Sequence, residues 1–309
     1  MKKSHIIIIA LPLLLLLASC APSILGNQPV KSGNDENTTV SPTDDSVWRI
    51  RVTDMQGSEA LNFSEQELAE LFAASDALLP EQTGLFTHMY STVNNWPASH
   101  IYAASGYSVA AILTAAGLKD NARTITFHGA DGYEVSFTAQ QLFSPQYYYP
   151  QAGENENGAE PVWPIIAYRW REGASDLSDI PHNKPSLIIG QRFPSEHNNA
   201  AFVVGIAEII IDNAPGEAWP AASTFPLPGS IAAGETVKLQ HPNYGMVKLY
   251  YTLDGSEPTY SSTLYNPSTY QPELNRPIPI TEPTTIKVLV SGYGKDDSAI
   301  AVFNFTPVE

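Results

Sequence analysis

Alternating apolar and polar positions mark the first structural elements of this chain. Residues 47–54 (VWRIRVTD) alternate with the period of two that is typical of a strand. The segment FSEQELAELFAA follows, and its apolar residues recur at helical spacing. Ser64 stands at the N-cap position of this segment, and Glu67 stands three residues later, where a capping box needs it. The pattern therefore predicts that a strand and then a helix open the first domain.

Three later segments extend this prediction. Residues 105–118 (SGYSVAAILTAAGL) predict a second helix that ends at Gly117. Residues 122–142 predict two strands around the turn 129–132 (GADG), and residues 200–212 (AAFVVGIAEIIID) predict a buried strand that closes the domain. The first domain is thus expected to be of the α+β class.

The composition changes after residue 213, where Pro, Ala, Ser and Gly become frequent. We therefore place a linker over 214–229 and a second domain over 230–309. Within the second domain, four segments alternate apolar and polar residues between Gly, Asp, Asn and Pro: ETVKLQHP, MVKLYYTLDG, RPIPITEPTTIKVLVSGYG and SAIAVFNFTPVE. This pattern predicts a small all-β, immunoglobulin-like sandwich of antiparallel strands.

The N-terminal residues predict export and lipid anchoring. Lys2 and Lys3 precede an apolar run over residues 6–17, which is too short for a comfortable membrane span and is typical of a secretion signal. The run ends in Leu-Ala-Ser-Cys, which resembles the bacterial lipobox, with Cys20 at the cleavage point. The resemblance implies a signal peptide over 1–19 and a lipidated Cys20. The alternative is an ordinary signal peptide with an incidental cysteine.

A polar segment, residues 20–46, follows the signal. It is rich in Asn, Ser, Thr and Pro and has almost no large apolar residues, so burial cannot offset the entropy lost on ordering. We interpret it as a flexible tether. The mature protein is then expected outside the cytoplasm, held to a bacterial membrane through its lipid, because no later stretch approaches the roughly 20 apolar residues of a spanning helix.

The net charge limits the classes of partner, and the cysteine content limits how the fold can be stabilised. The chain has 32 Asp and Glu against 16 Lys and Arg, a formal net charge of -16, which makes nucleic acid a poor partner. Cys20 is the only cysteine, so no disulfide within the chain can stabilise the fold. Stability must come from buried cores, and the 43% content of hydrophobic residues suffices for two ordinary domains.

The ordered segments of the first domain resemble a known family. The helix motif GYSVAAILTAAGL, the turn Asp131-Gly132-Tyr133 and the closing strand GIAEIII resemble the molybdopterin-binding oxidoreductase domain of the sulfite oxidase type over residues 47–213. The resemblance implies a pterin cofactor and a molybdenum ion held by a cysteine thiolate, a soft ligand that suits this metal. However, no cysteine follows residue 20, and the corresponding segment LFTHMYSTVNNW offers only the hydroxyls of Tyr90, Ser91 and Thr92.

This departure from the family leaves three roles for the first domain. It could bind a pterin-type or other small anionic ligand without redox chemistry, hold a metal through an unusual oxygen ligand such as Ser91, or serve as a scaffold. Candidate pocket residues are polar or aromatic groups near turns, together with arginines that can bind oxyanions in a fork. They are Ser91, Asn94, Asn95, Trp96, His100, His128, Asp131, Tyr133, Arg169 and Arg192.

The second domain resembles a different family. The segment Tyr250 to Thr259 (YYTLDGSEPT), followed by strand-like segments, resembles the C-terminal β-sandwich module of chitobiase and β-hexosaminidase. This module is usually accessory, and its resemblance implies no glycosidase activity. Tyr260, Tyr265 and Tyr270 are candidate contacts for a cell-surface glycan, and the alternative is that they cover the sandwich.

Together the patterns predict an envelope lipoprotein that acts in ligand binding or surface scaffolding, and they leave open whether it has an enzymatic activity. Two alternatives stay open. One is a molybdopterin-dependent oxidoreductase whose metal has no cysteine ligand, and the other is a glycan-binding surface protein that acts through its sandwich. No hydrolase or phosphate-binding motif is present, and the neighbours Ser195, Glu196 and His197 are a poor candidate for a triad, which needs side chains from separate elements.

Overall fold

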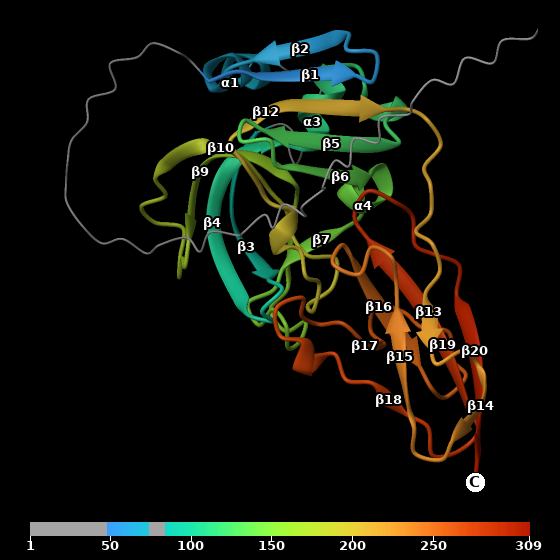
Figure 1. The fold of residues 1–309 in the computed structure, drawn as a ribbon. Coiled ribbons are helices and arrows are strands. Elements are labelled where there is room, and N and C mark those ends of the chain that lie inside the picture. The colour runs from blue at the N-terminus through green and yellow to red at the C-terminus, as the bar shows by residue number, and fades with distance from the viewer. Residues whose placement is uncertain (1–47, 74–83) are drawn as a thin grey trace, which may run out of the picture. The chain divides into compact units, whose positions relative to one another are not determined.

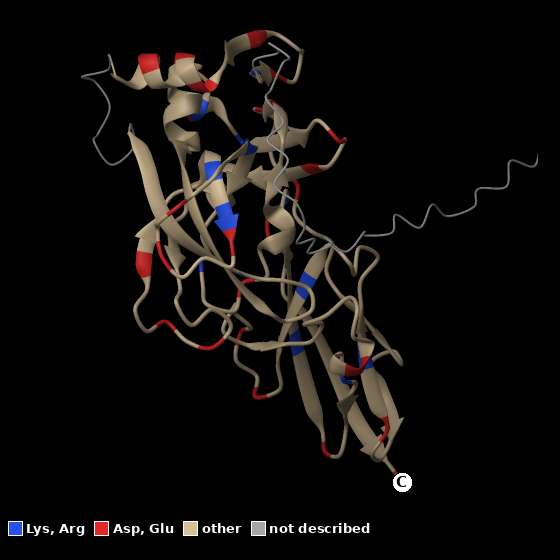
Figure 2. Cartoon of the chain, turned by 90° about the vertical axis from the view of Figure 1, so that its left-hand side faces the viewer, with Lys and Arg blue, Asp and Glu red and all other residues tan. Residues whose placement is uncertain are grey.

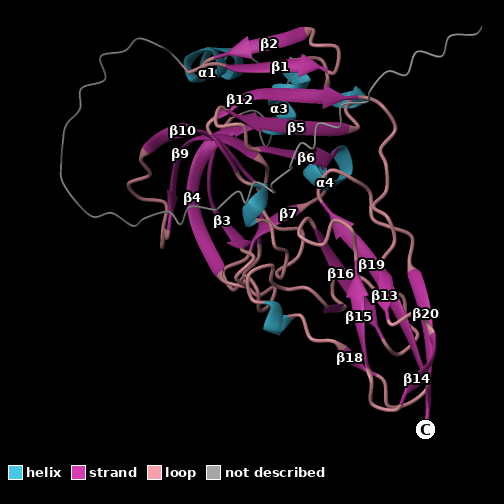
Figure 3. Cartoon of the chain, in the orientation of Figure 1, coloured by secondary structure: helices cyan, strands magenta, loops and turns pink. Residues whose placement is uncertain are grey.

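The computed structural model describes residues 48–73 and 84–309, which belong to one compact unit, Ser46–Glu309. Within this unit, a first lobe over 48–213 precedes a β-sandwich over 219–308 (Figure 1). Strands make up most of the regular structure in both parts (Figure 3). The predicted signal peptide, Cys20 and the tether lie outside the described residues.

One sheet of the first lobe joins both ends of its sequence. Its strands, in spatial order, are β2 (Glu59–Phe63), β1 (Ile50–Asp54), β12 (Ile206–Asp212), β5 (Thr124–Gly129) and β6 (Glu134–Thr138). The strands β1 and β12 pair in parallel, and all other neighbours are antiparallel. The strands predicted near residues 50, 125, 135 and 208 are therefore confirmed, and the last strand returns beside the first.

A second sheet of the first lobe is antiparallel throughout. Its strands, in spatial order, are β11 (Val203–Val204), β10 (His182–Ile188), β9 (Ile165–Glu172), β4 (Ser99–Ser108) and β3 (Leu85–Val93). A separate ribbon pairs β7 (Gln146–Tyr148) with β8 (Glu160–Val162). Buried side chains of both sheets, such as Phe127 and Ile209 from one and Ile166 and Leu187 from the other, form one core. The two sheets thus stabilise each other through a shared apolar layer.

Short helices complete the first lobe. They are α1 (Glu65–Ala73), α3 (Val109–Ala115) and α4 (Ala139–Phe143), with 3-10 turns at Lys119–Asn121 and Asn199–Ala201. The predicted capping box of α1 is confirmed, because the Ser64 backbone N donates to Glu67 Oε2 over 2.8 Å. A second capping box starts α4, where Gln141 Oε1 accepts from the Thr138 backbone N at 3.0 Å.

The helix predicted over 105–118 is shorter than expected. Its first residues, 105–108, belong to β4 instead, because they pair with β3 on one side and β9 on the other. The predicted end is confirmed: Gly117 has a φ of +69° and its N donates to Thr114 O at 2.9 Å. Sheet pairing on both sides thus overrode the helical propensity of the first turn.

The sandwich consists of two sheets around a separate core. One sheet has the order β13 (Ser223–Phe225), β15 (Thr236–Gln240) and β18 (Ile278–Pro279), and the other has the order β14 (Gly229–Ala232), β20 (Ala301–Val308), β19 (Thr284–Gly292), β16 (Val247–Thr252) and β17 (Thr263–Leu264). A 3-10 turn at Pro272–Leu274 lies between β17 and β18. Trp219, Leu249, Ile286 and Phe305 are buried in its core. The predicted β-sandwich is confirmed, and it includes Trp219 and β13 from the segment 214–229.

The chain is mainly β-sheet, and the first lobe carries only short helices among its described residues. The sulfite-oxidase-like architecture of that lobe stays a prediction. In the described part of the chain, Figure 2 shows acidic residues on a helix as well as on loops and strands. In the described part of the chain, no helix has the length and apolarity needed to cross a membrane.

Candidate functional site

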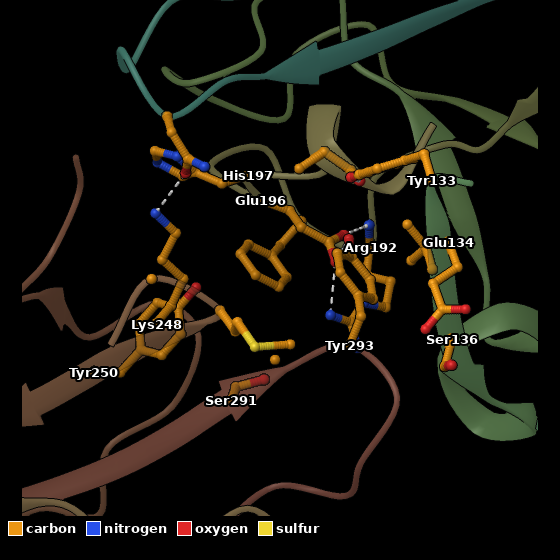
Figure 4. A pocket seen from close by; sticks show the side chains of 17 residues that line it. Tyr133, Glu134, Ser136, Arg192, Glu196, His197, Lys248, Tyr250, Ser291 and Tyr293 are labelled. Atoms are coloured by element: carbon orange, nitrogen blue, oxygen red, sulfur yellow. Dashed lines mark hydrogen bonds and ion pairs between the residues drawn. The ribbon is translucent and has the colours of Figure 1, made fainter. Parts of the chain in front are cut away.

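A pocket of about 400 Å³ lies where the first lobe meets the sandwich (Figure 4). Both parts contribute side chains to its wall. The first lobe provides Asn95, Tyr133, Glu134, Val135, Ser136, Arg192, Phe193, Glu196, His197 and Ala200, and the sandwich provides Gly245, Met246, Lys248, Tyr250, Ser291, Gly292 and Tyr293. The pocket volume falls in the range of small-molecule sites, about 300–1,000 Å³. Its lining mixes aromatic and polar groups, as such sites commonly do.

An ion pair forms one part of this wall. Arg192 Nη2 lies 2.6 Å from Glu196 Oε1, and the Arg192 backbone N donates to Glu196 Oε2 over 2.5 Å. The hydroxyl of Tyr293, from the sandwich, donates to Glu196 Oε1 at 2.8 Å. Burial opposes the charge of Arg192, but the nearby Glu196 carboxylate holds its pKa above the ordinary value. Arg192 is therefore paired within the protein and is not a free oxyanion fork.

Aromatic rings surround the Arg192 guanidinium. Its Cζ lies 5.5 Å from the ring centroid of Tyr260 and 5.7 Å from that of Tyr293. Phe193 stacks on Tyr260 with centroids 4.9 Å apart. These rings come from both parts of the chain, so the cation contacts the two sides of the boundary at once.

The side chain of Gln141, in the first lobe, forms hydrogen bonds with the backbone of the sandwich. Its Nε2 donates to the carbonyls of Gly292 and Lys295 at 2.7 and 2.8 Å. Its Oε1 accepts from the backbone N of Gly294 at 3.0 Å while it also caps α4. A single amide therefore satisfies three backbone groups of one sandwich loop. Gln141 is only 7% exposed, which makes these bonds costly to lose.

Lys248, on β16, lines the wall of the pocket that lies across from Glu134 and Ser136 (Figure 4). Its Nζ donates to Asn95 Oδ1 at 3.0 Å and to the carbonyls of Asn266 and Pro267 at 3.3 and 3.4 Å. Burial lowers the pKa of Lys248 to about 8. His197 lies nearby, and burial together with the Lys248 charge lowers its pKa to about 3. At neutral pH, His197 is thus uncharged and Lys248 is mostly protonated.

Two exposed aromatic rings stack where Asn95 meets the sandwich. Trp96, from the first lobe, and Tyr270, from the sandwich, have centroids 5.3 Å apart and ring planes inclined by 7°. The Ser268 hydroxyl donates to the Asn95 carbonyl at 2.7 Å and holds the two backbones together there. Trp96 is 53% exposed and Tyr270 is 45% exposed. Sequence reasoning named each ring for a different site, and the structure brings them together.

The third side of the pocket comes from β6 and the turn before it. Asp131 Oδ1 accepts from the backbone N of Tyr133, which shapes this turn, and the Tyr133 hydroxyl donates to the Ala200 carbonyl. Glu134 Oε2 lies 3.1 Å from His128 Nδ1. Figure 4 shows Glu134 and Ser136 across the pocket from Lys248. The pocket therefore has a cation on one wall and a carboxylate on the other.

The hydroxyls considered as metal ligands do not fit that role. Ser91 is fully buried; its Oγ donates to Gln191 Oε1 at 2.6 Å and accepts from the Tyr149 backbone N at 2.8 Å. The Tyr90 hydroxyl donates to the Trp163 carbonyl at 2.8 Å. In the part of the chain that the structure describes, no group of three or more His, Cys, Asp or Glu side chains could hold a metal ion. We derive no redox step from these residues.

Other predicted pocket residues lie away from the lining. Asn94 Nδ2 lies 2.8 Å from His100 Nε2, and His100 Nδ1 lies 2.7 Å from Glu172 Oε1. Arg169 is exposed on β9. From the predicted set, only Asn95, Tyr133 and Arg192 line the pocket, with Trp96 adjacent to Asn95 in sequence.

The three candidate tyrosines of the sandwich differ in environment. Tyr265 is 5% exposed in the sandwich core, and Tyr260 stacks on Phe193, with its hydroxyl 2.5 Å from Asp297 Oδ2. Tyr270 alone of these three presents a large exposed surface. Sequence reasoning missed Lys248, Phe193 and Tyr293, and it considered Glu196 and His197 only for a triad. These residues lie at the boundary between the first lobe and the sandwich. The spacing of residues along the sequence does not indicate which side chains will meet across that boundary.

Comparison with known proteins bears on the sandwich. Residues 226–302 match the model of the family described as chitobiase/beta-hexosaminidase C-terminal domain. No curated protein matches the chain. The resemblance of residues 230–307 to this family is therefore confirmed, while that of residues 47–213 to sulfite oxidase stays a prediction. The C-terminal sandwich of this chain is of the chitobiase/beta-hexosaminidase C-terminal type.

Proposed function

We propose that this protein binds a glycan at the bacterial envelope, at the boundary between its first lobe and its sandwich. The exposed stack of Trp96 on Tyr270 carries this proposal. A sugar ring presents flat C–H faces and a rim of hydroxyls, so it needs aromatic surface and polar partners together. The stack supplies the aromatic surface, and both rings keep about half of their area open to solvent.

The adjoining pocket supplies the polar partners. Glu134 offers carboxylate oxygens that accept from sugar hydroxyls, and Ser136 and Ser291 offer hydroxyls that donate or accept. Met246, which is 67% exposed, adds an adaptable apolar contact. The match of residues 226–302 to a module named after carbohydrate-active enzymes supports the same ligand class.

The anchor forms part of this proposal. Lipidated Cys20 would hold the protein to the outer face of a membrane, and residues 21–46 would tether the folded part within reach of surface glycans. Radiolabelled palmitate should enter the wild-type protein in its host, and a Cys20→Ala variant should neither incorporate the label nor sediment with membranes. Unlabelled wild-type protein would contradict the anchor without affecting the glycan site.

Binding itself is tested on the full-length protein in mild detergent. We expect retention by insoluble glycans such as chitin or peptidoglycan, and a Trp96→Ala variant should lose about tenfold in affinity because half of the stack is gone. A matched control is Leu253→Ala, which removes another exposed apolar side chain that does not line the pocket. The control should bind like the wild type.

Two results would contradict the glycan proposal. One is the absence of binding to any glycan tested, and the other is unchanged binding by the Trp96→Ala variant. Thermal unfolding of each variant shows whether a lost affinity reflects the site or a lost fold.

A further inference from the structure

Lys248 is a half-buried cation that forms no ion pair with any described acid. Its Nζ bonds three uncharged oxygens, two of them at 3.3 Å or more. No described acid forms an ion pair with it, although the ion pairs of the described residues include eight other basic side chains. In a chain of net charge -16, an unopposed lysine in a pocket wall is a conspicuous charge.

The surroundings of Lys248 keep its charge uncompensated. The pKa of His197 falls to about 3 because of burial and then because of the Lys248 charge, so the imidazole stays neutral. The Glu196 carboxylate is already engaged by Arg192 and Tyr293. Glu134 lies on the far wall of the pocket, beside His128 (Figure 4). A ligand anion would therefore meet no competing carboxylate at Lys248.

From this arrangement we infer that the glycan bound in the pocket carries an acidic sugar, whose carboxylate pairs with Lys248. The inference rests on the proposed function and names its ligand class. The sugar hydroxyls would face Glu134 and Ser136 on the opposite wall, where acceptors predominate. A second carboxylate on the same sugar would lie near Glu134 and be repelled by it. The site is therefore expected to prefer sugars with a single carboxylate, placed at the Lys248 side of the pocket.

The test compares two probes that differ only at C6, where methyl β-glucuronide carries a carboxylate and methyl β-glucoside carries a neutral hydroxymethyl group. Binding to the full-length protein is measured by ligand-observed NMR at pH 7. We expect the acid to bind about tenfold more tightly than the neutral sugar, and a Lys248→Met variant to lose this preference while still binding the neutral sugar. The control is Lys238→Met, which removes an exposed lysine of the same sandwich and should keep the preference.

A second measurement needs no variant. In the wild type, the preference for the acid should fall as pH rises from 7 to about 9.5, because Lys248 loses its proton over that range. The other titratable groups of the pocket wall are Tyr133, Glu134, Arg192, Glu196, His197, Tyr250 and Tyr293. Five of these groups have a shifted pKa: the pKa is raised for Tyr133, Arg192, Tyr250 and Tyr293 and lowered to about 3 for His197. None of these five shifts produces a change of charge near pH 8.

The outcomes separate the two claims. Equal affinity for both sugars, or a preference that survives both Lys248→Met and high pH, would overturn the acidic-sugar inference and leave glycan binding intact; in that case Lys248 serves only to join the lobes. Absence of binding by both sugars would overturn the acidic-sugar inference alone, because retention of the full-length protein by insoluble glycans decides the glycan proposal separately.

Discussion

His197 and Lys248, two basic residues of the pocket, have lower pKa values than the same side chains have in water. Burial lowers the pKa of both His197 and Lys248. For a basic group, a lowered pKa means that the unfolded chain binds the proton more readily than the folded one. Stability therefore falls as pH decreases into the range between the folded and the unfolded pKa.

His197 gives the clearest prediction of this kind. Its pKa is about 3 in the fold and 6.5 for an unperturbed histidine, so its contribution is fully present above pH 6.5 and is lost as pH falls towards 3. Relative to a His197→Gln variant, the wild type should lose about 2 kcal/mol of unfolding free energy between pH 6.5 and 4.5. Urea unfolding of both proteins at pH 7, 5.5 and 4.5 measures this difference. Parallel pH dependences would show that the imidazole is not held neutral.

At the scale of elements, local signals predicted much of the fold. The capping box of α1, the Gly117 stop of α3 and the turn 129–132 each depend on neighbours within a few residues, and such signals are readable in sequence. Residues 105–108 were predicted wrongly because their strand depends on β3 and β9, which are distant in sequence. Short-range patterns cannot report which strand will supply a partner.

A substitution at Gly106 tests how closely the backbones of β4 and β9 pack. The pairing register shifts between Ser105 and Gly106, and a Cβ at position 106 would lie 2.1 Å from the Ile166 carbonyl oxygen. The added Cβ would clash with the backbone of β9, which cannot move away without disturbing the sheet. Gly106→Ala should therefore lower the unfolding free energy by about 3 kcal/mol. Gly245→Ala is the control, since no atom lies within 4 Å of its added Cβ. Equal stability of the two variants in urea would contradict this packing.

At the scale of the molecule, the candidate site depends on the contact between two parts of the chain. Lys248, Glu196 and Tyr293 lie far apart in sequence and meet only because the sandwich packs on the first lobe. Sequence reasoning could propose Trp96 and Tyr270 individually as exposed aromatics, but it could not predict that they stack. Sequence reasoning named Arg192 as a pocket residue but did not predict its pairing with Glu196, which was considered only as a member of a triad.

Gln141 offers a test of this contact. Gln141→Glu replaces the donating Nε2 by an oxygen, which then faces the carbonyls of Gly292 and Lys295. We expect a loss of about 2–4 kcal/mol, and the sandwich should separate from the first lobe before either unfolds. The neighbouring Gln140→Glu makes the same charge change at an exposed position and should cost less than about 0.5 kcal/mol. A single, unshifted unfolding transition for Gln141→Glu would contradict the role given to this amide.

The stacked rings of Trp96 and Tyr270 also give the protein an internal optical reporter. Each ring belongs to a different part of the chain, and their parallel contact exists only while the two parts stay together. Coupled aromatic transitions of this kind contribute to near-ultraviolet circular dichroism. Loss of this signal while the far-ultraviolet spectrum persists would mark separation of the parts, and a sugar inserted against the rings would perturb the signal without any label being attached.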